Sequence, residues 1–149
     1  MGPLPTLWAS SGDQNLLRTS ILTILTEIVT AVGTSSNDAE RVHLQVLPLV
    51  SYSTNKNNKE SIYLAEEGYL LWKAILEHLT VYTTNIHNLF QNIIVTMKSQ
   101  DYEHTTNCVT LIELYLCSGG TNFMNSYSNE IANAFALTIN NIKTVRQHF

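Results

Sequence analysis

Residues 61–79, SIYLAEEGYLLWKAILEHL, decide the fold. Their apolar side chains recur three or four positions apart, which is the spacing of one face of an α-helix. We expect the buried face to consist of Leu64, Gly68, Leu71, Trp72, Ile75 and Leu79, and the opposite face to carry Glu66, Tyr69, Lys73 and Glu77. Glycine inside a helix costs up to about 1 kcal/mol relative to alanine. We therefore expect Gly68 to allow the close approach of a neighbouring helix.

The same spacing predicts five more helices, over about 14–33, 38–53, 85–98, 102–118 and 121–145. Glycines mark helix ends at Gly33 and at Gly119-Gly120. Pro48 lies inside the second helix and is expected to kink it near residue 44. No segment shows the alternation of a β-strand, so the sequence predicts an all-α fold of about six antiparallel helices.

Both ends of the chain add expectations of their own. Residues 1–13 contain Pro3, Pro5 and Gly12 and are expected to form an irregular leader. In the first helix the expected buried face is Leu17, Ile21, Ile24, Leu25, Ile28, Val29 and Val32. In the last two helices it includes Leu116 and Met124.

The order of the helix starts predicts a repeat. One series of helices begins near residues 14, 61 and 102 and the other near 38, 85 and 121, so each repeats every 36–47 residues or so. HEAT and armadillo repeats have periods of about 40–47 residues, against 33 or 34 for ankyrin and tetratricopeptide repeats. We therefore expect residues 14–149 to form a HEAT-like solenoid segment, an α-α superhelix. A globular bundle of six helices, which needs no such period, is the alternative.

Composition limits the classes of partner. The 149 residues are 44% hydrophobic, enough for a core, but only 13% charged, and the polar surface comes instead from 15 Asn, 12 Ser and 17 Thr. A net charge of −4 argues against nucleic acid and favours a basic macromolecular partner. The N-terminus lacks the basic region of a signal peptide, and no stretch of about 18 consecutive apolar residues is present, so we expect no membrane partner.

The reactive side chains form no recognisable catalytic or metal site. The five histidines form no HExxH motif and no pair four residues apart. If Cys108 and Cys117 share one helix, they lie on opposite faces, too far apart for a disulfide. Gly119-Gly120 is not followed by the Lys-Ser/Thr of a phosphate-binding loop. We expect a protein that is not an enzyme and holds no metal and no cofactor.

Three stretches resemble a known family. They are QVLPLVSYST at residues 45–54, YLAEEGYLLW at residues 63–72 and LFQN at residues 89–92. They are similar to segments of the importin-11-type β-karyopherins, which are HEAT-repeat nuclear transport receptors. The likeness extends more weakly over about residues 16–143 and falls in the C-terminal half of these longer receptors.

The resemblance implies a role for each helix. Helices 38–53 and 85–98 would be outer (A) helices, and 61–79 and 102–118 the inner (B) helices that follow them. Helix 14–33 would be a B helix without its A helix, and 121–145 an A helix without its B helix. Such end helices lack polar caps, so we expect exposed apolar surface at both ends and self-association of the isolated chain.

The resemblance also implies a function. The chain would be a protein-binding segment of the scaffold of a nuclear import receptor, present in cytoplasm and nucleus, with a concave B-helix face that touches a protein cargo. Ran-GTP would act through other parts of a full-length receptor, and no Ran-binding residue can be assigned here.

The candidate partner-binding residues lie on the polar sides of two B helices. They are Glu66, Lys73 and Glu77 on one and Glu103 and Glu113 on the next. Acidic and amide groups there would bind a basic cargo by complementary shape and charge. An ordinary solvated face is the alternative explanation of these residues. For the whole chain, the alternatives are a stand-alone helical protein-interaction module and a bundle that binds a small molecule or lipid in an apolar interior pocket.

Overall fold

The computed structural model describes residue 8 and residues 15–34, 38–99 and 102–147, with side chains as far as residue 140. The expected leader therefore lies outside the described residues, except for Trp8. The described helices are α2 (Asn15–Val32), α3 (Ala39–Thr54), α4 (Ser61–Glu77), α5 (Thr84–Leu89), α6 (Gln91–Lys98), the 3₁₀ turn η1 (Tyr102–His104) and α7 (Thr105–Gln147). These residues contain no β-strand.

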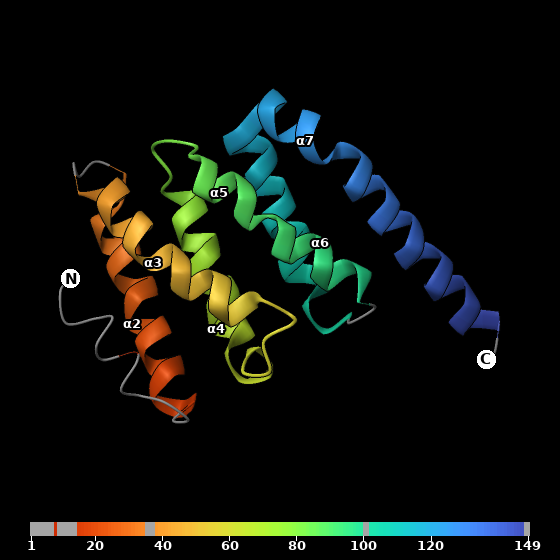
Figure 1. The fold of residues 1–149 in the computed structure, drawn as a ribbon, viewed down its shortest axis with the longest axis horizontal. Coiled ribbons are helices and arrows are strands. Elements are labelled where there is room, and N and C mark those ends of the chain that lie inside the picture. Colours follow the sequence, from red (N-terminus) through yellow and green to blue (C-terminus); the bar gives the residue numbers. More distant parts are fainter. Residues whose placement is uncertain (1–7, 9–14, 35–37, 100–101, 148–149) are drawn as a thin grey trace.

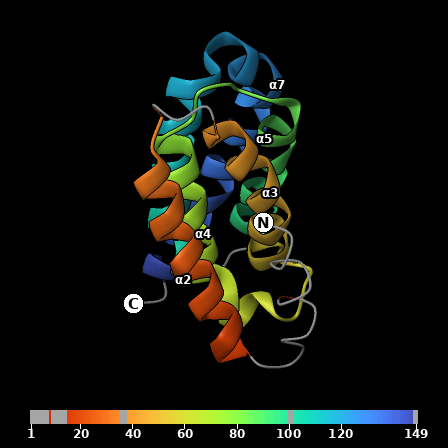
Figure 2. The same cartoon turned by 90° about the vertical axis from the view of Figure 1, so that its left-hand side faces the viewer.

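The helices form two layers that advance along one direction. Helices α2, α4 and the first half of α7 lie in one layer, and α3, α5 and α6 lie in the other (Figures 1 and 2). The main contacts join α2 to α4, α3 to α4, α4 to α7 and α6 to α7. Helix α2 and the second half of α7 lie at opposite ends of the long axis (Figure 1). The expected class, a helical solenoid segment built from two-helix repeats, is thus confirmed, and the globular-bundle alternative is wrong.

Two helical stretches are interrupted, one at Gly120 and one at Phe90. Helix α7 is broken at Gly120, whose φ of 52° and ψ of −132° are not helical, so residues 105–119 and 121–147 are two helices that meet at a corner. Phe90 separates α5 from α6 within the stretch expected to be a single helix over 85–98. Pro48, in contrast, lies inside α3, which continues through it as one helix.

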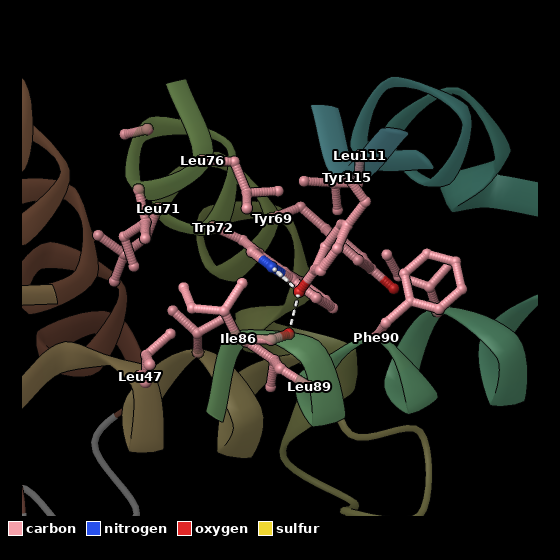
Figure 3. Packing of buried hydrophobic residues seen from close by; sticks show 14 of the residues in the cluster. Leu47, Tyr69, Leu71, Trp72, Leu76, Ile86, Leu89, Phe90, Leu111 and Tyr115 are labelled. Carbon is pink, nitrogen blue, oxygen red and sulfur yellow. Dashed lines mark hydrogen bonds between the residues drawn. The ribbon is translucent and has the colours of Figure 1, made fainter. Parts of the chain in front are cut away.

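Aromatic side chains link the two layers. Trp72, Phe90, Tyr115 and Phe123 are fully buried. The indole nitrogen of Trp72 donates a hydrogen bond of 3.1 Å to the Tyr115 hydroxyl, which donates one of 2.7 Å to the carbonyl of Ile86 (Figure 3). This chain of bonds joins α4, α7 and α5, and Trp72 is a core residue as expected.

Close approach of α3 to α4 explains Gly68. A β-carbon at Gly68 would strike the hydroxyl oxygen of Ser53 and would lie 3.0 Å from the side chain of Thr54. The side-chain amide of Asn92 on α6 then donates to the Ser51 carbonyl and the Thr54 hydroxyl, both at 3.2 Å. The C-terminal turn of α3 is thereby fixed against both α4 and α6.

Some expected burial is wrong. Tyr69 is expected on the exposed side, but it is buried. Its hydroxyl donates a hydrogen bond of 3.3 Å to the hydroxyl of Thr96 on α6. Leu116 and Met124 were placed inward, but both are exposed. A helix that packs against two helices of its own layer and one helix of the other layer buries a wider arc of its surface than a single apolar stripe. A helix at an end of the stack has fewer neighbours and buries a narrower arc.

Helix α2 illustrates the narrower arc. Arg18 and Leu22 are buried against the rest of the fold, whereas Leu17, Ile24 and Ile28 on the flank are 37%, 56% and 39% exposed. Their expected burial is therefore wrong. The repeat leaves this flank of α2 without a neighbouring helix among the described residues.

Arg18 holds Trp8, a residue near the N-terminus, against the fold. Its guanidinium lies 4.8 Å from the ring centre of Trp8 and 5.4 Å from that of Tyr52. It also donates to the Tyr52 hydroxyl at 3.0 Å and the Trp8 carbonyl at 3.2 Å. Trp8 is thus part of the core, although it falls in a segment expected to be an irregular leader.

Candidate functional site

The exposed side of α4 carries three of the five candidate residues. Lys73 and Glu77 follow Glu66 by seven and eleven positions, so the three residues lie on one side of the helix. All three are exposed. The Lys73 ammonium lies 3.6 Å from the Glu77 carboxylate, with the two side chains 48% and 44% exposed. An exposed pair of this kind contributes little to stability, because both partners remain solvated.

Glu66 on α4 lies close to the histidine that follows Glu103 in η1. The Glu66 carboxylate lies 3.8 Å from Nδ1 of His104, which is the neighbour of Glu103 in η1. The His104 ring packs against Tyr69 with ring centres 5.0 Å apart. Glu103 and His104 also line a cavity of about 60 Å³ with Lys56 and Tyr69. The structure therefore brings Glu66 and Glu103 to the same end of the fold.

Glu113 lies apart from the other four. It is exposed on the first half of α7, and no described ion pair or hydrogen bond joins it to the rest of the candidate set. The set is thus a pair at the end of α4, a second group around His104, and one separate carboxylate.

Sequence reasoning missed the apolar part of this surface. Ile62, Tyr63 and Leu70 are 82%, 61% and 48% exposed, and they alternate along α4 with the charged residues. We call Ile62, Tyr63, Glu66, Leu70, Lys73 and Glu77 the α4 stripe. The signal was present in the sequence, because these apolar residues fall outside the buried face of the helix, but only the polar residues were assigned to a surface.

His43 is a buried histidine without hydrogen bonds. Both ring nitrogens lack a partner, and this residue of α3 is only 3% exposed. Burial holds the pKa of His43 below its usual value, and the nearby His78 lowers this pKa further, whereas Glu40 opposes the shift. His43 lines a cavity of only about 10 Å³, so it is a structural group with a consequence for pH dependence.

A groove lies in the other layer, between α3 and the α5–α6 pair. It has a volume of about 360 Å³ and is lined by Leu44, Leu47, Pro48, Ser51, Asn85, Asn88, Leu89 and Asn92. None of these side chains is charged. The candidate residues of the α4 stripe and η1 lie elsewhere.

Neither metal ligation nor catalysis gains support from the described residues. No group of three or more His, Cys, Asp or Glu side chains there is arranged to hold a metal ion. Cys108 is buried and Cys117 is exposed, and neither forms a disulfide.

By length and composition, α2 could cross a membrane. Its 18 residues have a mean hydropathy of 1.3, although they include Arg18 and Glu27 and are therefore not a run of consecutive apolar residues. Core helices of soluble proteins pass the same test, and α2 packs on α4 and α3. Its composition therefore carries no membrane assignment.

Comparison with known proteins identifies related sequences. The family model described as "Importin-11-like, TPR repeats" matches residues 19–148. Importin-11 of Homo sapiens and that of Mus musculus are each 29% identical over 144 residues, which is 97% of this chain. The importin beta-like protein KAP120 of Saccharomyces cerevisiae is 22% identical over 114 residues, or 74% of the chain.

These relatives are much longer than the chain. It spans 14% of the length of the two importin-11 sequences and 11% of KAP120. No solved structure matches. The family description names tetratricopeptide repeats, the other class of two-helix solenoid that the helix spacing was weighed against.

Proposed function

The chain belongs to the importin-11-like family, and from this premise we propose that it is a protein-binding scaffold segment of a nuclear import receptor. The observation that carries the proposal is the family match over residues 19–148, together with relatives that are all importins by name. The receptor works in cytoplasm and nucleus, and this segment contributes to cargo transport between them without catalysing a reaction.

The proposed binding face is the layer of α2, α4 and the first half of α7, together with η1, whose His104 lies 3.8 Å from Glu66. Glu66, Glu77, Glu103 and Glu113 make it acidic, and Lys73 is the cation paired with Glu77. A rigid stack holds these carboxylates at fixed separations, so a basic protein of matching shape gains from several of them at once. Each charge alone contributes little to the affinity. Their arrangement favours a partner of matching charge and speeds its association with the chain.

Ran-GTP acts through other parts of the full-length receptor in this proposal. The segment holds cargo, and release follows from changes made elsewhere. Binding of cargo to the 149-residue chain is therefore expected to be insensitive to Ran-GTP.

Capture from a nuclear and cytosolic extract tests the proposal. The immobilised chain is compared with a variant in which Glu66, Glu77, Glu103 and Glu113 are changed to Gln, and the captured proteins are identified and ranked by net charge. The control is Glu40→Gln, which neutralises an exposed carboxylate in the other layer.

We expect the chain and the control to enrich basic proteins equally, with or without Ran-GTP, and the four-site variant to lose them. Capture that requires Ran-GTP would contradict this placement of the segment. Capture unchanged by the four substitutions would contradict the proposed face.

A further inference from the structure

Apolar side chains are the unexplained part of the α4 stripe. Tyr63 and Leu70 are 61% and 48% exposed, although both are large enough to be buried in a core. They flank Glu66, with Lys73 and Glu77 further along the same side. Exposed apolar side chains that gather on one side of a helix and are rimmed by charged residues are found at surfaces that bind another protein.

The charges of the stripe cannot supply most of a binding energy. The Lys73–Glu77 pair and the Glu66–His104 pair, at 3.6 and 3.8 Å, involve groups that water already solvates or that already have a partner. Affinity at protein interfaces comes instead from a few aromatic and large side chains that lose contact with water on binding. Ile62, Tyr63 and Leu70 are the large apolar side chains of the stripe, and Tyr63 and Leu70 lie beside its charged residues.

We propose that the α4 stripe binds an amphipathic basic helix of the partner, with Tyr63 and Leu70 as the apolar anchors. The proposal rests on the proposed function and specifies the element of the cargo that is recognised. The carboxylates of Glu66 and Glu77 orient this helix through its basic side chains.

The spacing of the anchors favours a helix over an extended segment. Tyr63 and Leu70 are seven residues apart on α4, which is about 10.5 Å along the helix. A partner helix places apolar side chains seven residues apart on one face at the same distance. An extended chain rises about 3.3 Å per residue, and side chains three residues apart then point to opposite sides.

The charges of the stripe determine which charge we expect on the partner helix. Glu66 and Glu77 belong to the stripe, Lys73 is its single cation, and Glu103 of η1 lines a cavity with Ile62 of the stripe and with Lys56. A helix with lysines or arginines beside its apolar face is complementary to this pattern, and an acidic helix is repelled by it.

Three synthetic peptides of 18 residues test the proposal with the complete 149-residue chain. The first has leucines three, four and seven positions apart, with lysines at the helix positions that flank this apolar face on both sides. The second has the same composition without helical periodicity, and the third carries glutamates in place of the lysines. Fluorescence anisotropy of the labelled peptides measures their affinities.

We expect the first peptide to bind at least tenfold more tightly than the other two. Tyr63→Ala and Leu70→Ala should each weaken its binding about tenfold, and Val95→Ala, an exposed apolar residue on α6, should leave it unchanged. Circular dichroism confirms that each variant keeps its helices, as the exposure of these residues predicts.

Equal binding of the first two peptides, or unchanged binding by the Tyr63 and Leu70 variants, would overturn the proposal. The extract experiment separates this failure from a failure of the proposed function. If the chain captures basic proteins but does not discriminate between the peptides, only the recognition of a partner helix is refuted. If it captures no basic protein, the proposed function itself is refuted.

Discussion

The indole N–H of Trp72 donates a hydrogen bond of 3.1 Å to the hydroxyl of Tyr115 inside the core, and the same hydroxyl donates one of 2.7 Å to the Ile86 carbonyl (Figure 3). Burial raises the pKa of Tyr115 well above its usual value, so the hydroxyl stays protonated and remains a donor. One side chain therefore satisfies a donor on α4 and an acceptor on α5 together.

Tyr115→Phe should lower the free energy of unfolding by about 1–3 kcal/mol, because it leaves the Trp72 indole and the Ile86 carbonyl unpaired in the core. Urea denaturation followed by circular dichroism measures the change. Tyr63→Phe, which removes an exposed hydroxyl, should have no measurable effect. An equally small effect for Tyr115→Phe would mean that water replaces the missing bonds.

Gly68→Ala should destabilise the chain by about 1–3 kcal/mol, because the added methyl group is forced against Ser53 and Thr54. Helix propensity alone predicts the opposite sign, a gain of about 1 kcal/mol. Thermal unfolding distinguishes the two. The double variant with Ser53→Ala should recover part of the loss, and stabilisation by Gly68→Ala alone would show that α3 and α4 are less close.

Gly120→Ala should cost about 1–3 kcal/mol although no atom lies within 4 Å of the added methyl group. The cause is the backbone, since a φ of 52° with a ψ of −132° is rarely adopted by other residues. The neighbouring Thr121→Ala, at an exposed position, is the control. A melting temperature unchanged by Gly120→Ala would indicate that α7 can straighten.

Acid should destabilise the chain through His43. The pKa of His43 lies below 6.5 in the folded protein, so the unfolded chain takes up the proton first as the pH falls. The stabilisation is complete above pH 6.5 and declines below it, down to the folded-state pKa. Chemical denaturation between pH 8 and 5 should show a steeper loss for the chain than for His43→Leu. Parallel profiles would mean that His43 has no such role.

The exposed flank of α2 should cause self-association. Leu17, Ile24 and Ile28 form an apolar row on the outer side of this end helix. Sedimentation velocity at rising concentration should show oligomers, which Ile24→Gln with Ile28→Gln should reduce and Val95→Gln should not. A chain that remains monomeric at high concentration contradicts this prediction.

Sequence periodicity predicted features that depend on one helix and its nearest neighbour. The corner at Gly119-Gly120 follows from glycine chemistry, and Gly68 indicated a close approach because nothing else favours glycine inside a helix. Trp72 fell on the buried face because its neighbours Leu71 and Ile75 share that face. In each case the local pattern and the packing agree.

Features that depend on a third helix could not be obtained in this way. Tyr69 is buried because its hydroxyl is bonded to Thr96 on α6. The residue spacing of α4 alone cannot predict that α6 packs at this point. Leu17 and Ile24 continue the apolar pattern of α2, but no described helix covers them. For the candidate site, periodicity placed the charged residues on the exposed side of α4, whereas the meeting of Glu66 with His104 required the arrangement of two helices.

The order of the helices along the stack also governs how the chain reaches its structure. Because the main contacts join elements close in sequence, little entropy of loop closure is needed, and such topologies fold rapidly. Structure can nucleate at α4, which has partners on several sides, and spread in both directions. Amide hydrogens in the centre of the stack should then exchange more slowly than those toward either end.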